Sequence, residues 1–554
     1  MNAIYLLLVG LGTMALGYFV YSKFVAEKLY RLDPNFVTPA HELRDGIDYI
    51  PTNKFVLWGH HFTSVAGAAP IVGPAIAVFW GWLPAFLWVT IGTVFMAGVH
   101  DFGALWASVR HRGQSMGALT GKVIGHRAKS LFMIVIFLLL LMVNSAFAVV
   151  IAKLLVHDPA ATIPAWGAIV VALIIGQAIY RYRMGLLWPS IIGVAVLYTL
   201  IFVGQAYPVS LPDQVMGLTP NAQWILILFA YAAIASMLPV WVLLQPRDYI
   251  NGLQLFIGLG LLYAATIIAA PDVVAPMINQ NLPEGTPPLV PLLFVTIACG
   301  AISGFHGLVA SGTSSKQLDK ETDARFVGYF GAVGEGMLAL AAIICTVAGF
   351  ATISEWEGVY SSFGQGSLAA FVNGGGRILA DGLGISPELG GTILSVMAIL
   401  FAGTTMDTGM RLQRYVIQEV GEMTSFKPLQ NGYVATGVAL VTCLALAFGA
   451  GGDGSGGMII WPLFGTTNQL LAGLTLAILS VILARLGRPI VFTAIPLALL
   501  LAVTVYALLI QLGSFWSDGN WLLIGMDLII LVAALWVSVE AGLALTKRSA
   551  DQPT

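Results

Sequence analysis

The fold of this chain depends on residues 59–74, which read GHHFTSVAGAAPIVGP. The segment is apolar enough to lie in a membrane, but Pro70 and Pro74 each remove a backbone donor from a helix. Gly67 and Gly73 lie beside these prolines, so we expect a broken helix. Non-helical backbone at membrane depth is tolerated only where it is buried in protein or lines a cavity. The alternative is an ordinary proline kink.

The amino-acid composition places the chain in a membrane. Of its 554 residues, 58% are hydrophobic and 9% are charged, whereas soluble domains carry about 25% charged residues. The net charge of -2 offers no basic surface for nucleic acid. Three cysteines lie in apolar runs without disulfide or metal spacing, and we interpret them as buried apolar side chains. They are Cys299, Cys345 and Cys443.

Segments long enough to cross a bilayer recur along the whole chain. A hydrocarbon core of about 30 Å requires about 20 apolar residues per helix. On this criterion we predict about 15 spans, at residues 3–22, 62–80, 82–107, 131–155, 162–180, 185–206, 223–245, 252–270, 289–313, 326–353, 389–406, 432–450, 456–482, 490–512 and 519–545. The first segment lacks a basic leader and a cleavage site, so we expect a retained span. The stretch 354–388 carries charges and consecutive glycines and is expected to form a loop, with at most a short interfacial helix.

The positions of Lys and Arg test this number of spans. Cytoplasmic loops of membrane proteins are enriched in these two residues. If the most basic loop, 108–130, lies in the cytoplasm, alternation through the spans brings all but two of the 25 Lys and Arg to that side. The two exceptions are Lys153 and Arg377. In this scheme 246–251 is a short cytoplasmic loop, the N-terminus is outside and the C-terminus is cytoplasmic.

A second interruption lies five spans after the first. Residues 231–240, YAAIASMLPV, bring Ser236 and a proline into the seventh predicted span. Broken helices at corresponding places in two halves are typical of inverted-repeat transporters. The spans within 62–206 and 223–406 would form two five-helix repeats that enter the membrane from opposite sides. This is the arrangement of the leucine-transporter-type fold of the APC superfamily.

The predicted fold class is therefore an all-α polytopic membrane protein with a 5+5 inverted-repeat core and extra helices at both ends. Four parts are expected along the chain. They are an N-terminal transmembrane helix and cytoplasmic loop at 1–58, a first repeat at 59–220, a second repeat at 221–431 and C-terminal transmembrane helices at 432–554.

Hydroxyl groups gather where this fold often holds a cation, between the first broken helix and the eighth helix of the core. The span 289–313 takes the eighth place and leads into a run of small and hydroxyl residues. We assign ion coupling to Ser311, Thr313 and Ser314. The alternative is that small residues allow close helix packing, with their hydroxyls bonded to the preceding turn.

Four ionisable residues fall at membrane depth, where charges are costly and usually functional. Glu335 is the deepest carboxyl group and has glycine neighbours, so we expect it to carry a proton for ion coupling. His306 lies within the span 289–313. Asp101 and Asp407 lie beside basic residues of the flanking loops, and we assign them gating or structural ion pairs. A purely structural pairing is the alternative for each.

The histidines could also be interpreted as a metal cluster with Asp101. His60 and His61 are adjacent, and no pair among them and His100 or His306 has the i, i+4 spacing of helical metal ligands. We therefore predict neither a metal nor a cofactor. A further polar run, 461–469, is either a packing network or part of a transport pathway.

Several of these strings resemble the carbon starvation protein A (CstA) family of bacterial membrane transporters. The matching strings are GHHFTSVAGAAPIVGP at 59–74, VHDF at 99–102, SGTSSKQ at 311–317, DT at 407–408 with RLQRY at 411–415, and WPLFGTTNQ at 461–469. They extend over most of the chain, and the first is long enough to be specific. The resemblance implies uptake of peptides or pyruvate under nutrient limitation, usually driven by protons, and it fits the leucine-transporter-type superfamily.

The sequence thus predicts an ion-coupled secondary transporter of the bacterial inner membrane that imports pyruvate or short peptides. The partners we expect are the substrate, a coupled proton or sodium ion and the lipid bilayer. The substrate-lining residues we expect are His60, His61, Thr63, Ser64, Gly67, Ser236, Ser303 and His306. A channel and an intramembrane metal-dependent enzyme are the alternatives, although no catalytic residue is predicted. Oligomeric state is left open.

Overall fold

The computed structural model describes residues 1–185, 187–240, 242–364, 367–449, 451–454 and 456–546. Within these ranges the regular structure is helical, apart from isolated bridges of extended backbone. The helices are α1 (Ala3–Leu16), α2 (Ser22–Phe24), α3 (Pro39–Glu42), α4 (Lys54–Ala66), α5 (Ala69–Ala77), α6 (Trp82–Gly92), α7 (Gly98–Arg110), α8 (Met116–Val123), α9 (His126–His157), α10 (Thr162–Gly176), α11 (Leu187–Ala206), α12 (Pro220–Met237), α13 (Leu244–Ala269), α14 (Leu289–Thr296), α15 (Ala298–Ala301), α16 (Gly304–Gly312), α17 (Phe330–Ala348), α18 (Ile353–Val359), α19 (Ser367–Leu383), α20 (Pro387–Met423), α21 (Lys427–Gln430), α22 (Gly432–Phe448), α23 (Gly456–Ile459), α24 (Trp461–Arg485), α25 (Val491–Ser517) and α26 (Trp521–Thr546). The predicted all-helical class is confirmed for these residues.

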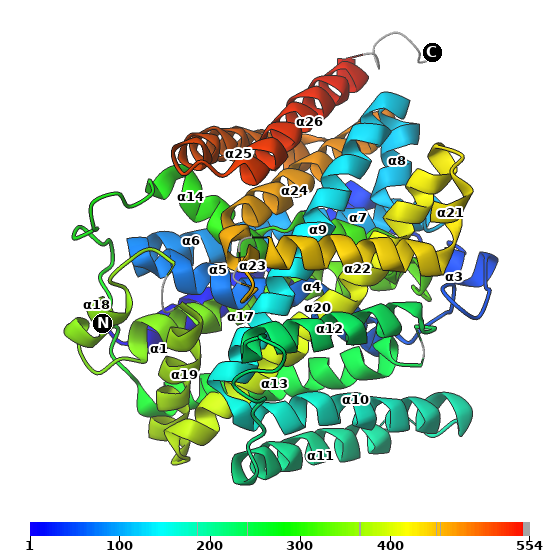
Figure 1. Cartoon of the computed structure of the whole chain (residues 1–554). Coiled ribbons are helices and arrows are strands. Elements are labelled where there is room, and N and C mark those ends of the chain that lie inside the picture. The colour runs from blue at the N-terminus through cyan, green and yellow to red at the C-terminus, as the bar shows by residue number, and fades with distance from the viewer. Residues whose placement is uncertain (186, 241, 365–366, 450, 455, 547–554) are drawn as a thin grey trace.

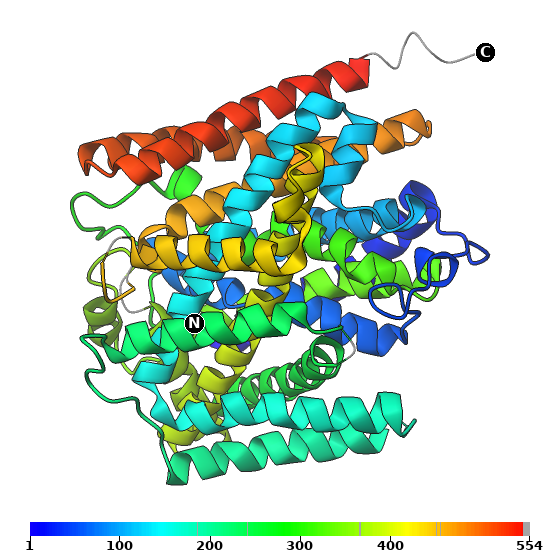
Figure 2. The ribbon, with the colours of Figure 1, turned by 45° about the vertical axis from the view of Figure 1, so that its right-hand side comes forward.

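Many of the long helices run in a common direction, which is close to horizontal in Figure 1. The N-terminus lies on the left of that view, near α18, whereas α26 ends on the right, the side of α8 and α21. Helices α10 and α11 form one edge of the bundle and α25 and α26 the opposite edge, as Figures 1 and 2 show. The two longest helices, α9 with 32 residues and α20 with 37, pack on each other in the interior.

Among the described residues, 12 helices are long and apolar enough to cross a membrane, or up to 13 if the bent pair Lys54–Ala66 and Ala69–Trp80 is one span. This finding supports a multi-pass membrane protein. Two further predicted spans correspond to helical segments that are shorter. They are the single helix α22 and the interrupted series α14 to α16. The number of 15 spans therefore stays a prediction.

The structure corrects three predicted loops. Residues 246–251 belong to α13, and α20 continues through the expected loop that follows 406 to end at Met423. The stretch 354–388 contains α18 and α19, and α19 packs against α13, α17 and α20. Its glycines allow this close packing, because a Cβ atom on Gly374 would lie 2.3 Å from the carbonyl oxygen of Cys345. Charged or glycine-rich sequence therefore marked buried helix contacts rather than loops.

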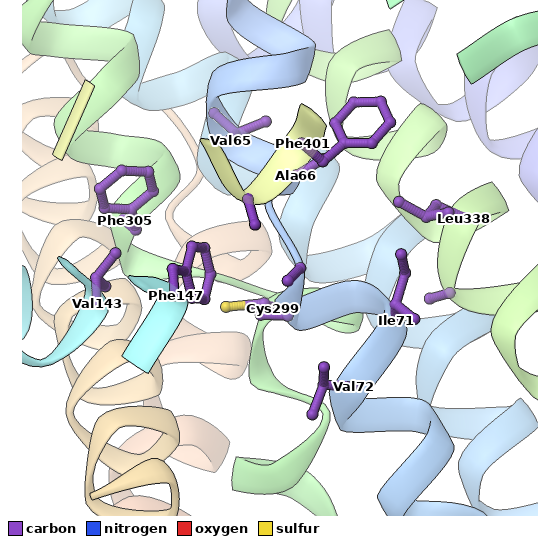
Figure 3. Close-up of a cluster of buried hydrophobic side chains, with 14 of the residues drawn as sticks. Val65, Ala66, Ile71, Val72, Val143, Phe147, Cys299, Phe305, Leu338 and Phe401 are labelled. Atoms are coloured by element: carbon purple, nitrogen blue, oxygen red, sulfur yellow. The ribbon is translucent and has the colours of Figure 1, made fainter. Parts of the chain in front are cut away.

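The first broken helix has the predicted interruption. Helices α4 and α5 meet at an angle of 43°, and Gly67 ends α4 with a φ angle of 57°. A side chain there would collide, because a Cβ atom would lie 2.5 Å from the Phe147 ring. Figure 3 shows buried apolar side chains around this break, including Phe147 and Phe401. The break is thus enclosed in protein, as unpaired backbone at membrane depth requires.

At two more interruptions, side chains from other helices form hydrogen bonds with backbone groups at the helix ends. Helix α12 ends at Met237, and the Arg411 guanidinium donates hydrogen bonds to the carbonyl oxygens of Ala235 and Leu238. Helix α16 begins after extended backbone at Ser303, where the Asn468 side-chain oxygen accepts a hydrogen bond of 2.9 Å from the Phe305 amide. Helix ends leave backbone groups without partners, and these two side chains supply them. The break before α16 was not predicted from the sequence.

We expect the Gly73→Ala variant to destabilise the protein. A Cβ atom on Gly73 in α5 would lie 2.4 Å from the backbone oxygen of Thr296, and such overpacking costs about 1–3 kcal/mol. The matched control is Gly437→Ala in α22, where nothing lies within 4 Å. Thermal unfolding of the two purified variants should show a lower midpoint for Gly73→Ala alone. Equal midpoints would contradict the packing of α5 against α14.

Candidate functional site

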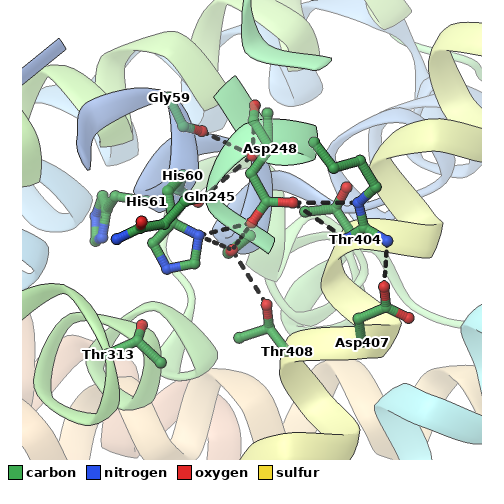
Figure 4. Close-up of polar contacts among 12 residues, drawn as sticks. Gly59, His60, His61, Gln245, Asp248, Thr313, Thr404, Asp407 and Thr408 are labelled. Atoms are coloured by element: carbon green, nitrogen blue, oxygen red, sulfur yellow. Dashed lines mark hydrogen bonds and ion pairs between the residues drawn. The ribbon is translucent and has the colours of Figure 1, made fainter. Parts of the chain in front are cut away.

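A first buried ionic cluster surrounds Asp248 at the start of α13. The carboxylate oxygen Oδ2 lies 2.6 Å from His60 Nδ1 and accepts a hydrogen bond of 3.3 Å from the Ser64 hydroxyl. Its other oxygen, Oδ1, accepts a hydrogen bond of 3.1 Å from Arg247 Nη2. Figure 4 shows these contacts between α4 and α13. Asp248 and His60 have no exposed surface, so their polar atoms depend on partners within the protein.

The same guanidinium reaches a second carboxylate on α20. Arg247 Nη1 forms an ion pair with Asp407 and donates a hydrogen bond of 2.5 Å to the Tyr231 hydroxyl. That hydroxyl in turn donates a bond of 2.7 Å to Asp407 Oδ2. We call His60, Tyr231, Arg247, Asp248 and Asp407 the Arg247 cluster. It joins four helices, α4, α12, α13 and α20, through one buried cation.

Sequence reasoning missed Arg247 and Asp248 because a charged stretch inside an apolar chain was assigned to a loop. The two residues follow Pro246, which is tolerated in the first turn of a helix. The available signal was the break at Pro239, five spans after the first break. A charged group placed directly after such a break can reach the interior of the bundle.

A second buried cluster lies between α7, α16 and α17. Asp101 accepts from two histidines, since Oδ1 lies 2.7 Å from His100 Nδ1 and Oδ2 lies 2.7 Å from His306 Nδ1. The other ring nitrogen of His306 lies 3.0 Å from Glu335 Oε2, close enough for an ion pair but not aligned for a hydrogen bond. We call these four residues the His306 cluster. It contains two acids and two histidines, and their side chains are almost completely buried.

Asp101 and Asp407 do not pair with the arginines that lie near them in the sequence. Arg110, in the basic stretch after Asp101, pairs with Glu321 instead. Arg411, beside Asp407, bonds to carbonyl oxygens at the end of α12. Asp407 is therefore held by the distant residues Tyr231 and Arg247, and Asp101 by its neighbour His100 and the distant His306. The gating role itself stays a prediction.

His61 connects the broken helix α4 with the predicted ion-coupling residues. Its Nδ1 lies 2.8 Å from the hydroxyl oxygen of Ser314. A Cβ atom on Gly331, one helical turn before Glu335, would lie 2.9 Å from His61 Cδ2. The adjacent histidines thus face different groups, with His60 at the Arg247 cluster and His61 at Ser314. The structure brings these predicted substrate and ion-coupling residues together.

Other predicted residues lie around these two clusters. Ser64 lies 3.2 Å from the hydroxyl of Thr408, a residue that sequence reasoning did not select, and Thr63 donates to the carbonyl oxygen of Gly59 at 2.7 Å. Ser311 and Thr313 donate to carbonyl oxygens of their own helix, at 2.7 and 2.9 Å. These last contacts are the ones expected if the hydroxyls serve packing.

Two predicted substrate residues have different surroundings. Ser236 donates to the carbonyl oxygen of Ala233 in its own helix at 2.9 Å. Ser303 bonds to Asn468, whose Nδ2 lies 2.9 Å from the serine oxygen. Within the described parts of the chain, no hydrogen bond joins either serine to the two clusters. Their assignment to the substrate site stays a prediction without direct structural support.

Several buried polar atoms of the site have no hydrogen-bond partner among the described residues. They are Nε2 of His60, His61, His100 and His306, together with Glu335 Oε1 and Asp407 Oδ1. Buried polar groups normally have partners, so these atoms can bind a proton, water or a polar ligand. Across the described residues, no group of three His, Cys, Asp or Glu side chains is arranged to hold a metal ion. The prediction of a metal-free site stays a prediction.

Comparison with known proteins places these residues in a family context. The family model described as Carbon starvation protein CstA matches residues 2–360 and 351–507. A Campylobacter jejuni protein named Peptide transporter CstA is 35% identical and aligns with 94% of this chain and 81% of its own length. A Helicobacter pylori protein of the same name is 33% identical, over 91% of this chain and 81% of its own.

A protein with a different named substrate is similar too. The Escherichia coli Pyruvate/proton symporter BtsT is 30% identical over 93% of this chain and 82% of its own length. Among solved structures, a manganese transporter from Eremococcus coleocola covers 91% of this chain and 99% of its own at 12% identity. Its TM-score of 0.44 is too low for a common fold to be inferred.

We expect the Arg247→Gln variant to lower the free energy of unfolding by about 3–5 kcal/mol, because it leaves two buried carboxylates without their cation. The double variant Arg247→Gln with Asp407→Asn should recover part of this loss. Thermal unfolding of the purified proteins in one detergent measures both effects.

The matched control for this prediction is Arg112→Gln, which breaks the exposed ion pair with Glu42 at 3.2 Å. Exposed pairs contribute about 0–1 kcal/mol, so its unfolding midpoint should stay close to that of the unchanged protein. If Arg247→Gln behaved like this control, the Arg247 cluster would not be a stabilising element.

Proposed function

The chain belongs to the carbon starvation protein CstA family, and on that basis we propose that it is a proton-coupled secondary transporter for small carboxylate nutrients. The substrates we propose are pyruvate and short peptides, imported across the bacterial inner membrane under carbon limitation. Similar proteins named as transporters, one of them a pyruvate/proton symporter, support the general activity. The choice of proton rests on the His306 cluster.

The His306 cluster has the chemistry of a proton-binding site. Its four side chains can each gain or lose a proton, and they form one chain of contacts from His100 through Asp101 and His306 to Glu335. No Lys or Arg belongs to the cluster, so its charge depends on how many protons it holds. Buried ionisable groups of this kind mark proton pathways in membrane transporters. This arrangement is the observation that carries the proposal.

The proposed substrate position lies beside His60 and His61 on α4, about two turns before the break between α4 and α5. A carboxylate can accept a hydrogen bond from His61 Nε2 when Nδ1 of that ring accepts from Ser314, and from His60 Nε2 when the ring, whose Nδ1 donates to Asp248, holds a second proton. Each of these histidines is fixed at its other nitrogen, by Asp248 and by Ser314. A substrate held there would lie between the two clusters, so binding could change the protonation of either one.

Alternating access requires that two groups of helices move relative to each other. We propose that these groups derive from two five-helix repeats, 59–220 and 221–431, flanked by 1–58 and 432–554. Helices broken at α4–α5 and between α12 and α13 support this division. The N-terminus and the end of α26 lie on opposite sides of the bundle, as expected for an external N-terminus and a cytoplasmic C-terminus.

We expect the Glu335→Gln variant to lose accumulation of substrate driven by a pH gradient, because an amide cannot release a proton. Exchange of labelled for unlabelled substrate should persist, since exchange needs no net proton transfer. Uptake of labelled pyruvate and of a labelled dipeptide into proteoliposomes measures both activities.

The matched control is Glu355→Gln, which removes an exposed carboxylate paired with Arg377 and should accumulate substrate normally. Unchanged accumulation and pH dependence in Glu335→Gln would rule out its role as proton carrier. If an imposed sodium gradient drove uptake and Thr313→Ala abolished only that dependence, sodium would replace the proton as coupling ion.

A further inference from the structure

A polar cavity of about 450 Å³ opens at the end of the bundle where α8 and α21 lie. Residues from α8, α9, α16 and α20 line it, together with residues from three segments between these and other α-helices. Its polar lining includes Tyr49, Gln114, Lys129, Lys316, Tyr415 and Glu419. A volume of this order is typical of small-molecule sites, about 300–1,000 Å³. A larger cavity of about 540 Å³ beside α22 is lined almost entirely by apolar residues and does not suit a charged ligand.

Lys316 is the unusual residue of this lining. Its side chain is only 18% exposed, and its ammonium group lies 5.4 Å from the Tyr49 ring centre and 5.3 Å from that of Tyr415. The nearest carboxylate oxygen, on Asp48, is 4.0 Å away. Asp48 accepts bonds of 3.3 Å from the Tyr415 hydroxyl. Aromatic rings attract the cation but accept no conventional hydrogen bond from it.

An ammonium group has three donors, and burial without hydrogen bonds is costly. No hydrogen bond of the Lys316 side chain is found among the described residues, so water or an anion must supply acceptors. The other lysine of the cavity differs, because Lys129 lies 2.6 Å from Glu419 and is already paired. On the same lining, Gln114 has a buried side-chain oxygen without a partner. Lys316 is thus a cation whose ion pair with Asp48 is long, at 4.0 Å, and which retains hydrogen-bonding capacity for an anion, beside an amide that can bind a second polar group.

Helix α16 connects this cavity with the His306 cluster. Leu308, Ser311 and Gly312 line the cavity, and His306 lies earlier on the same helix. Five residues of an α-helix span about 7.5 Å, so Ser311 lies close to one and a half turns from His306 along the axis. A substrate that moves from its position between the two clusters toward the α8 and α21 end would enter the cavity past these residues.

We propose that this cavity is the passage by which a carboxylate substrate leaves the protein, and that Lys316 binds the carboxylate there. The inference rests on the proposed transport function. The segment that carries Tyr49 and Asp48 is held in place, because Asp45 accepts three backbone hydrogen bonds at 2.8–2.9 Å. It forms one wall of the exit, where Lys316 lies over the Tyr49 ring and the Tyr415 hydroxyl bonds to Asp48.

The first test measures exchange of labelled pyruvate and of a labelled dipeptide separately at the two membrane faces. In inside-out vesicles, Lys316→Gln should raise the substrate concentration at half-maximal exchange about 10- to 100-fold, the effect of losing a charged hydrogen bond. The value in right-side-out vesicles should stay close to that of the unchanged protein. Lys316→Arg, which retains the charge, should restore most of the affinity, and the exposed Lys320→Gln is the matched control.

The second test uses a cysteine placed at Ala118 on the cavity wall. The three native cysteines are buried, so a charged thiol reagent should label Ala118→Cys and leave the unchanged protein unlabelled. Pyruvate should slow this labelling, whereas its uncharged amide should not, and Lys316→Gln should remove the protection. The comparison of acid with amide needs no variant at Lys316 and therefore remains decisive if Lys316→Gln does not fold.

Each outcome decides one of the two proposals. Equal changes at both faces, or none, in Lys316→Gln would overturn the exit assignment while leaving transport intact. Labelling that acid and amide slow equally would also overturn it. If the unchanged protein exchanged neither labelled substrate, the transport proposal would fail, and protection by the acid alone would still support an anion site at Lys316.

Discussion

One buried guanidinium, that of Arg247, holds together the part of the structure on which the site depends. A cation at membrane depth is costly unless opposite charges surround it. Here Asp248 and Asp407 lie on two sides of it, and the Tyr231 hydroxyl completes the contacts. The pairs of this charge join the first turns of α13 to the middle of α20. Removal of the guanidinium would leave two buried carboxylates without their cation.

Helix α4 connects the Arg247 cluster with the surroundings of the His306 cluster. His60 contacts Asp248, whereas His61 on the next position contacts Ser314 and lies against Gly331. Adjacent residues on a helix point about 100° apart, because there are 3.6 residues per turn. A movement of the broken helix would therefore change the surroundings of both histidines together. This geometry provides a physical route by which a substrate at the two histidines and protons at the His306 cluster can influence each other.

Much of the architecture could be predicted because apolar length is a local property of the sequence. The expected spans correspond to helices or interrupted helical segments. The first broken helix is interrupted at Gly67, just before Pro70, as expected, whereas α5 continues through Pro74. Loops were predicted less well. Glycines 374–376 suggested flexible backbone, yet α19 uses them to approach α17 and α20. A glycine has the same local conformational preferences in a flexible loop and in a close contact between helices. Only its neighbours in space show which of the two it forms.

The candidate site, too, could be predicted from the sequence only in part. By itself, the sequence determined a multi-pass helical membrane protein, a break after His61 and ionisable residues such as Asp101, His306 and Glu335 at membrane depth. These follow from hydrophobic length, from the missing amide of proline and from the rarity of charge in apolar segments. Only the tertiary structure decided that Arg247 lies between two carboxylates and that Lys316 faces a cavity. Pairing partners are distant along the chain, and the energy of a buried charge depends on which groups the fold places around it.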